Sequence, residues 1–248
     1  MNHPPRTIGR LLGGAALALA ALTAACTTGR RVDTADLLGA ESPAARALQA
    51  QDAYPVVKRA ETSTWSDRAG AGDFMRAVAP GADPDSWLVT DSRDGRTLTE
   101  DLFVRNPKGD VVLVKTTSHV EGVISWFAPA LVVMPAELAP GETFRQTTSI
   151  KVFPIDDPDN VRDQGPVTQE LTLEAEQSFG LSGGPTPARR VRAVFTTKLS
   201  AASVVKTTDL WFVGGRRPGL VAERSEEVVK ALGLTVRTTR RFLALESD

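Results

Sequence analysis

Hydrophobic and polar residues alternate with a period of two along much of the chain after residue 53. In the stretches 144–152, 171–175 and 191–199, apolar side chains occupy alternate positions, and mostly Arg, Gln, Glu, Lys and Thr lie between them. Such alternation is typical of antiparallel strands with one buried and one solvated face. Further strands are expected at three places: 204–213, 220–229 and 234–245.

The pattern predicts about ten strands and little helix. Strands twist, and a flat sheet of that size is disfavoured. We therefore expect a mainly β fold: a single antiparallel, strongly curved sheet that forms an open or half barrel, with short N-terminal helices.

Local signals predict one hairpin and one short helix in the first half of this region. Asp94-Gly95 is a strong two-residue hairpin signal. Asp73 is expected to cap a short helix through Phe74, Met75 and Val78, closed by Pro80 and Gly81. Residues 221–232 are predicted as a strand, although the letters SEEVVKAL within them also suit a helix.

The N-terminus has the layout of a secretory signal. Arg6 and Arg10 precede an apolar run, and the small residues Ala24 and Ala25 lead into Cys26. A membrane-spanning helix is disfavoured because the run is shorter than about 20 residues and rich in Gly and Ala. The sequence therefore predicts export.

The end of this signal resembles a bacterial lipobox, with Thr23 where that motif usually has leucine. The resemblance implies a diacylglyceryl thioether on Cys26, cleavage just before it, acylation of the new amino terminus and membrane attachment through the lipid. Thr27 stands where an inner-membrane retention aspartate would be, which points to the periplasmic side of an outer membrane. In an organism without one, the outer face of the plasma membrane is expected. The alternative is an ordinary cleaved signal with Cys26 near the cut.

Three segments follow from these signals: a signal peptide over 1–25, the lipidated cysteine and a tether over 26–52, and one β domain over 53–248. The tether is polar and alanine-rich, and Ser42-Pro43 predicts the start of a short helix through Ala44 and Leu48.

Charge and cysteine content narrow the function classes. Loss of Arg6 and Arg10 leaves 27 of the 29 basic residues against 30 acidic ones, a formal charge of −3, which gives no basic signature of nucleic-acid binding. With Cys26 lipidated, the mature chain has no disulfide, so a hydrophobic core must hold the fold.

The stretch from Trp126 to Glu142 contains Pro129, Pro135 and Pro140, which predict extended pieces that are not central strands. We expect it to lie across one mouth of the curved sheet. Its apolar side chains, together with two phenylalanines of later strands, are the candidate lining of an apolar ligand site: Trp126, Phe127, Leu131, Val133, Met134, Phe195 and Phe212.

This stretch resembles a Pro-rich segment of the TapB-like family of secreted and lipid-anchored bacterial proteins. There it precedes an A-x-R-V strand and a W-[FY]-x…G-L-V strand pair, whose places are taken here by Ala188–Val191, Trp211–Val213 and Gly219–Val221. The resemblance spans roughly residues 97–245. It implies a sheet akin to the LolA-type lipoprotein carriers and no particular activity.

One catalytic motif is present in letters only. Gly180–Gly184 matches the G-x-S-x-G nucleophile elbow, which requires a following helix and a later histidine. Pro185 and Pro187 follow instead, and His119 precedes Ser182. A hairpin turn is the favoured interpretation, and His119 is expected to be structural.

Two charged groups suggest ligands but have simpler interpretations. A cluster of acidic and amide residues suits either calcium or a solvated loop, and its spacing fails the EF-hand pattern: Asp156, Asp157, Asp159, Asn160 and Asp163. Eight arginines suit either phosphate groups or a solvated face paired with nearby acids, and the latter is favoured: Arg189, Arg190, Arg192, Arg216, Arg217, Arg237, Arg240 and Arg241.

Three function classes remain open. A non-enzymatic structural or partner-binding envelope protein is favoured, and a carrier or sensor of a lipid or other apolar ligand in the concave face is the alternative. An enzyme is disfavoured, and no catalytic residue, cofactor or metal is expected. A packed concave face would indicate the first class, an apolar cavity the second, and a polar cleft with perturbed carboxylates the third.

Overall fold

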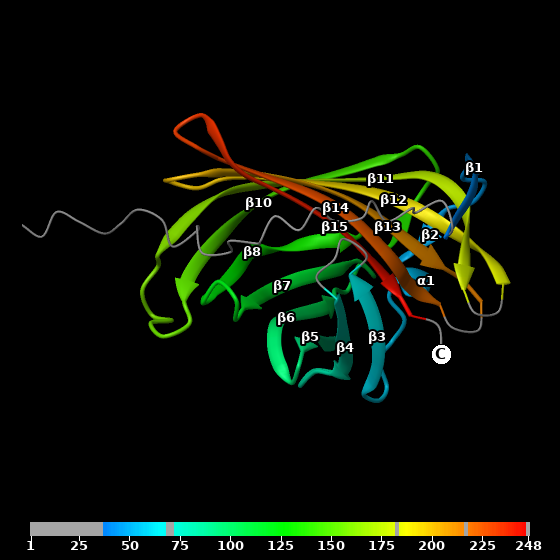
Figure 1. Ribbon diagram of the computed structural model, residues 1–248, viewed down its shortest axis with the longest axis horizontal. Coiled ribbons are helices and arrows are strands. Elements are labelled where there is room, and N and C mark those ends of the chain that lie inside the picture. Colours follow the sequence, from blue (N-terminus) through cyan, green and yellow to red (C-terminus); the bar gives the residue numbers. More distant parts are fainter. Residues whose placement is uncertain (1–36, 68–71, 182–183, 216–217, 247–248) are drawn as a thin grey trace, which may run out of the picture.

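The computed structural model describes residues 37–67, 72–181, 184–215 and 218–246 (Figure 1). These residues are mainly β with almost no helix, as the alternation predicts. The strands and the one helix are β1 (Leu38–Pro43), β2 (Leu48–Gln49), α1 (Ala50–Ala53), β3 (Glu61–Asp67), β4 (Gly72–Pro80), β5 (Ser86–Arg93), β6 (Arg96–Arg105), β7 (Val111–Ser118), β8 (Val123–Met134), β9 (Glu137–Leu138), β10 (Thr143–Pro154), β11 (Asp163–Leu181), β12 (Gly184–Lys198), β13 (Ser203–Val213), β14 (Gly219–Ala231) and β15 (Leu234–Leu245).

Twelve of the described strands form a closed antiparallel barrel rather than the expected half barrel of about ten strands. Strands β3–β8 and β10–β15 follow one another around the wall, and each pairs with its neighbours in the chain. The first and last strands of this series close the ring, because Trp65–Asp67 of β3 pair with Leu243–Leu245 of β15. Within the described residues, three residue pairs make that closure.

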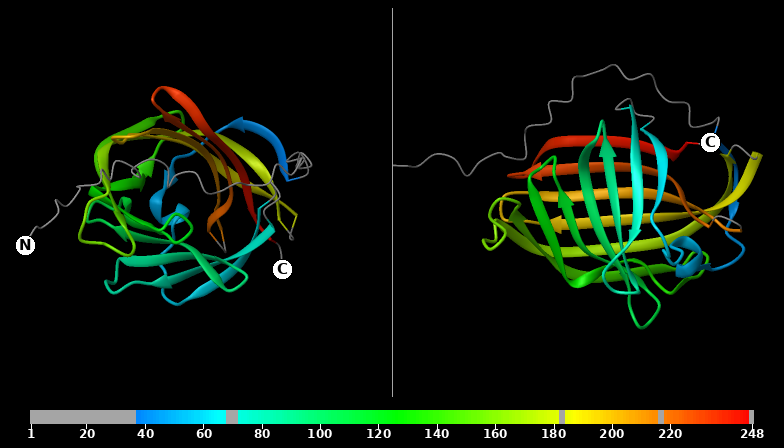
Figure 2. Two further views of the ribbon diagram at one scale, coloured as in Figure 1. Left: turned by 60° about the vertical axis from the view of Figure 1, so that its left-hand side comes forward. Right: turned by 90° about the horizontal axis from the view of Figure 1, so that it is seen from below.

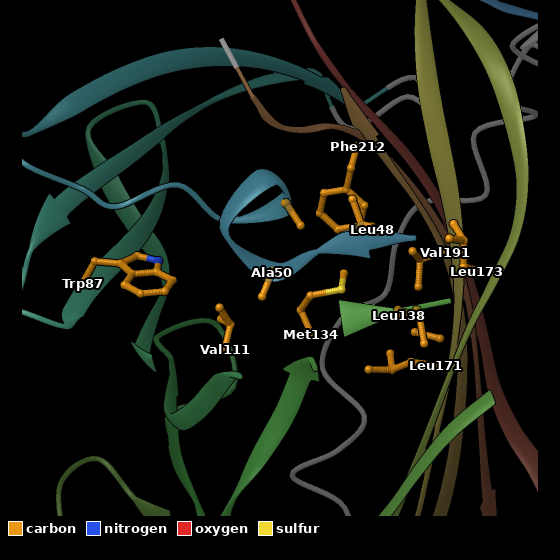
Figure 3. Packing of buried hydrophobic residues seen from close by; sticks show 12 residues of the cluster. Leu48, Ala50, Trp87, Val111, Met134, Leu138, Leu171, Leu173, Val191 and Phe212 are labelled. Carbon is orange, nitrogen blue, oxygen red and sulfur yellow. The ribbon is translucent and has the colours of Figure 1, made fainter. Parts of the chain in front are cut away.

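One end of the barrel is filled by a plug made of β2, α1 and β9. The left view of Figure 2 shows α1 inside the ring of strands. Strands β2 and β9 pair through Leu48 and Leu138, and the amide of Ala50 donates to the carbonyl oxygen of Ala136 at 3.0 Å. Figure 3 shows these side chains packed against inward residues of the wall, including Trp87 and Phe212.

The plug corrects the expected tether over its second part. The predicted helix after Ser42 does not form, since Pro43 ends β1, which pairs with β11. Leu48, Ala50 and Ala53 are buried in the core. These three side chains therefore lie in the end of the barrel rather than in solvent. The alanine-rich composition of the segment did not predict this burial.

The predicted helix over Asp73–Val78 is also wrong, and those residues lie in β4. Phe74 and Val78 are four residues apart, a spacing that fits one face of a helix and one face of a strand equally well. Pairing with β3 and β5 on both sides decides for the strand. By contrast, residues 221–231 are a strand as predicted, and Asp94 and Gly95 form the predicted turn with positive φ.

A second apolar cluster lies on the outer face of β13–β15. Trp211 and Val213 alternate with Phe212, so they point away from the plug. Leu37 and Leu38 pack against this cluster, and the Trp211 indole donates to Gln177 at 3.0 Å. The N-terminal strand therefore covers apolar surface outside the barrel.

Within the described parts of the chain, no helix has the length and apolarity needed to cross a membrane.

Candidate functional site

The barrel lumen changes from apolar to charged with distance from the plug. On β5, Trp87 packs against the plug, and Val89 and Asp91 follow on the same face. Strand pairing places Arg76 of β4 opposite Asp91, and Asp101 of β6 opposite Val89. Paired residues share a face of a sheet, so all three charged side chains point into the lumen.

The opposite wall shows the same change. Phe212 of β13 packs against the plug, and Leu210 and Lys206 lie further along the same face. Glu223 of β14 pairs with Leu210 and accepts a hydrogen bond from Lys206 at 3.5 Å. The lumen therefore carries a ring of charged side chains beyond the apolar core.

The side chains of this charged ring keep partial contact with solvent. The side chains of Arg76, Asp91 and Glu223 keep 15%, 18% and 17% of their exposure although they point inward, and Lys206 keeps 41%. Figure 1 places α1 at one end of the barrel and the turn between β14 and β15 at the other. We call this part of the lumen, with the inward side chains of Arg76, Asp91, Asp101, Lys206 and Glu223, the cup.

Cations of the cup are paired with acids. Arg76 donates two hydrogen bonds to Asp91, at 2.7 and 2.8 Å. Three further pairs join β13, β14, β15 and β3: Lys206–Glu223 at 3.5 Å, Arg241–Asp67 at 3.6 Å and Arg237–Glu227 at 2.6 Å. Because every partner faces inward, this is a polar interior held by ion pairs rather than by apolar packing.

Asp101 differs from the other cup acids. No ion pair to it is found within the described residues, and its Oδ1 atom is buried without a hydrogen-bond partner. Burial raises the pKa of Asp101 to about 6, with a further rise from Asp91. The hydrogen bond from Thr116 and the charges of Arg76 and Lys206 oppose that rise. The carboxyl therefore lies where ionisation is costly.

For Arg76 and Glu223, the oppositely charged neighbours together affect the pKa more strongly than burial does. Burial alone would lower the pKa of Arg76, but the hydrogen bonds and charge of Asp91 raise it above its ordinary value. Burial would likewise raise the pKa of Glu223, but Lys206 and Arg76 hold it below its ordinary value. Both side chains are thus charged at neutral pH.

Tyr54, which follows α1, forms the floor of the cup. Its ring lies 5.6 Å from that of Phe212, 6.0 Å from Phe103 and 6.5 Å from Trp87. Burial and the charge of Glu223 raise the pKa of its phenol. At the plug itself, Arg105 donates to the Tyr54 carbonyl oxygen at 2.6 Å. Tyr54 therefore separates the apolar core from the charged ring.

One side of the cup is apolar. Phe127 of β8 pairs with Ile150 of β10, and both belong to a cluster with Leu131 and Val167. Four half-buried side chains pack on this cluster: Leu113, Val152, Phe195 and Leu199. Phe195 pairs with Lys206, so the apolar wall borders the charged ring. The inward face of the barrel beyond the plug thus has an apolar side and a charged side.

Strands β8 and β10 are hydrogen-bonded over only part of their length. These strands pair only over Val123–Ala128, and beyond Pro129 the side chain of Gln146 replaces the ladder. Gln146 accepts from the amide of Val132 at 2.7 Å and donates to the carbonyl of Ala130 at 3.0 Å. A surface cavity of about 420 Å³ lies at this gap, lined in part by Val112, Pro129, Val132 and Phe144.

Six of the seven predicted lining residues are inward or buried. Phe127, Leu131 and Phe195 belong to the apolar wall, whereas Val133, Met134 and Phe212 pack around the plug. Trp126 does not share their face: it is 43% exposed and lies beside Lys115 on the outer wall.

The prediction that this stretch stays out of the central sheet is also wrong, because β8 lies between β7 and β10. Pro129 stands where pairing with β10 ends, and β7 pairs with Leu131, Val132 and Met134 beyond it.

The remaining candidates lie away from the cup or outside the described residues. Cys26 and Ser182 fall outside them. His119 contacts Glu100 at 2.8 Å near a turn. Asn160 donates to Asp157 within the acidic loop, and the described residues include no group of three or more metal-type ligands.

Several of the eight arginines are paired with acids, as a solvated face predicts. Arg190 contacts Glu41 and Glu174, both at 2.9 Å, and Arg240 contacts Glu226 at 2.9 Å. Arg237 and Arg241 instead belong to the cup.

Sequence reasoning missed the charged ring. Asp91, Asp101 and Glu223 are acids on strands whose polar positions are expected to face solvent, so the alternation does not mark them as inward. The one available signal was on β5, where Asp91 stands two residues after Val89 and four after Trp87, on the same face.

No protein-family model, curated protein or solved structure matches the chain.

Proposed function

We propose that this chain is a lipid-anchored cell-envelope protein that binds a small amphipathic molecule in the cup. The observation that supports this most is the two-sided lumen, with Phe127, Ile150 and Phe195 on one side and the ion-paired ring on the other. Apolar surface lined with a few convergent polar groups is the usual composition of a ligand site.

The anchor follows from the lipobox resemblance at Cys26. That residue lies 12 positions before Leu38, so the linking chain spans at most about 40 Å. Strand β1 lies at the plug end (Figure 1), and β14 alone has 13 residues, about 43 Å of strand. Anchoring through Cys26 would therefore keep the plug end of the barrel within about 40 Å of the membrane.

Binding is favoured over catalysis. A raised carboxyl pKa is common at active sites, but structural ion-pair networks produce the same shift. The described cup contains neither histidine nor cysteine beside Asp101, and its other acids are paired with cations.

Binding in the cup is tested with the neutral fluorophore N-phenyl-1-naphthylamine, whose emission rises in apolar sites. We expect a saturable rise with one site per protein. Ser125→Trp, which fills the lumen beside Val152, should abolish it, and Ser149→Trp on the outer face should not. No saturable rise in the native protein, or equal binding by both variants, would refute the proposal.

The anchor is tested separately. Mass spectrometry of the native N-terminus should show a chain that begins at Cys26 and carries acyl groups, and Cys26→Ser should release a folded protein from membranes. An unmodified thiol would refute the anchor without affecting the binding experiment.

A partner-binding module remains a second candidate, supported by the β14–β15 turn. Leu232 is fully exposed and has a φ of 51°, and Leu234 and Val236 beside it are also exposed. Three exposed apolar side chains on one hairpin tip are typical of a contact surface. Truncating all three to Ser should abolish a partner contact and leave fluorophore binding unchanged.

A further inference from the structure

The described side chains of the cup include more acids than cations. Of the described inward charges beyond the plug, Arg76, Lys206, Arg237 and Arg241 each contact an acid, and those acids are Asp91, Glu223, Glu227 and Asp67. Asp101 is left without an ion pair, and one of its oxygens has no hydrogen-bond partner.

The other inward arginines do not offset this charge. Arg105 donates to the carbonyl oxygen of Tyr54, and Arg189 donates to that of Ala47 at 2.7 Å, so both are committed to the plug. Glu121, which contacts Arg237 at 3.8 Å, adds a further acid at the mouth. The cup therefore has a net negative charge.

Asp101 is also placed within reach of the apolar wall. Around the barrel it pairs with Thr116, which pairs with Ser125, which pairs with Val152. Three strand spacings of about 4.8 Å separate Asp101 from Val152, about 14 Å along the wall. Val152 packs on the cluster that contains Phe127 and Ile150.

From this arrangement we infer that the cup is selective for an amphipathic amine: its cationic group contacts the Asp101 carboxylate, and its apolar body lies against the wall of Phe127, Ile150 and Phe195. A cation supplies the missing partner of Asp101, and the hydrogen-bonded contact is stronger because the carboxyl is charged. An anionic ligand would instead add charge to a cup that already has a surplus acid. The inference rests on the proposed binding function and adds the class of ligand.

Charge selectivity is tested with three dansyl probes of similar size: cationic dansylcadaverine, an uncharged dansyl N-alkylamide, and anionic dansylglycine. The cationic probe should bind about tenfold or more tightly than the uncharged one, as expected for a hydrogen bond to a charged group, and the anionic probe should bind most weakly. Equal affinity for cationic and uncharged probes would overturn the inference and leave the proposed function intact. Failure of all three probes to bind would instead refute the proposed function.

Variants then assign the selectivity to Asp101. Asp101→Asn keeps the shape and should remove the preference for the cation, whereas Asp101→Glu keeps the charge and should retain it. The matched control is Glu100→Gln, the next residue of β6, whose side chain contacts His119 outside the cup. A preference that survives in Asp101→Asn, or that is lost in Glu100→Gln, would contradict the assignment. Comparison of the probes on the native protein decides the selectivity even if a variant does not fold.

Protonation supplies a second readout. The groups that face Asp101 are Arg76 and Asp91 from one side, Lys206 from the opposite wall and Tyr54 from the floor. Asp101 itself is expected to titrate near pH 6, because burial raises its pKa to about 6. Binding of the cationic probe should therefore weaken below that pH, while binding of the uncharged probe should not. Parallel weakening of both probes would indicate loss of structure and contradict the inference.

Discussion

Replacing Asp101 with Asn should stabilise the protein at neutral pH. Burial raises the pKa of Asp101 from an ordinary value of 3.8 to about 6. The folded protein therefore binds the proton more tightly than the unfolded chain does. The stability that this group contributes is fully present below about pH 4 and is lost as the pH rises through about 6.

The magnitude follows from the shift. About two pKa units correspond to about 3 kcal/mol, since each unit is worth about 1.4 kcal/mol. Solvent in the cup screens the carboxylate, so we expect about 1 to 3 kcal/mol. Asn removes the charge, and its amide oxygen still accepts the hydrogen bond from Thr116. For a chain of this size, each kcal/mol raises the melting temperature by about 2 to 4 °C.

The assay is urea unfolding of the native protein and of Asp101→Asn at several pH values between about 4 and about 7.5. The difference in unfolding free energy should grow with pH in favour of the variant, because all other titrating groups are common to both proteins. Glu100→Gln should show no such growth. A difference that is constant with pH, or that grows in favour of the native protein, would refute the reasoning.

Three further predictions concern other parts of the barrel. Arg76→Met leaves Asp91 charged and unpaired, so it should lower the unfolding free energy by about 2 to 4 kcal/mol in urea unfolding, and a neutral effect would contradict the ion-pair account. Gln146→Ala removes two hydrogen bonds between β10 and β8 and should cost about 1 to 3 kcal/mol, with faster amide exchange at Val132 than in the native protein. Leu232→Asn relieves a leucine with positive φ and should raise stability by about 1 kcal/mol in thermal unfolding, and a loss would show that leucine packs there.

The strand content was predictable because the outer face of the wall is wet and its alternation is regular. Closure of the barrel was not, because it depends on pairing between Trp65–Asp67 and Leu243–Leu245. Those segments lie at the two ends of the domain, and no local pattern reports on their meeting. The plug was missed for a related reason, since Leu48 and Ala50 become core residues only when the barrel end surrounds them.

The candidate site was predictable only on its apolar side. Phe127 and Phe195 are large apolar residues in alternating strands, which predicts an inward direction. Trp126 is also a large aromatic residue, but it is the neighbour of Phe127 in β8 and so lies on the opposite face of the strand. The prolines of this stretch predict against a central strand, so the sequence does not indicate which face Trp126 occupies. The charged side was hidden because an inward acid in β6 and an outward acid in β6 have the same local pattern. Asp101 and Glu100 are neighbours in sequence, and only pairing with β5 and β7 separates their faces.

Asp101 is a partly buried acid without an ion-pair partner among the described residues, and its contacts do not fully compensate for its burial. A sequence that specifies one fold normally satisfies burial, pairing and propensity together, and departures tend to mark functional positions. Arg76 and Asp91 follow the rule, since each compensates the burial of the other. Asp101 does not, because its carboxyl is partly buried, unpaired and expected to destabilise the fold at neutral pH. The protein with an uncharged residue at this position would be at least as stable. We therefore attribute the carboxylate to the binding of a positively charged group in the cup.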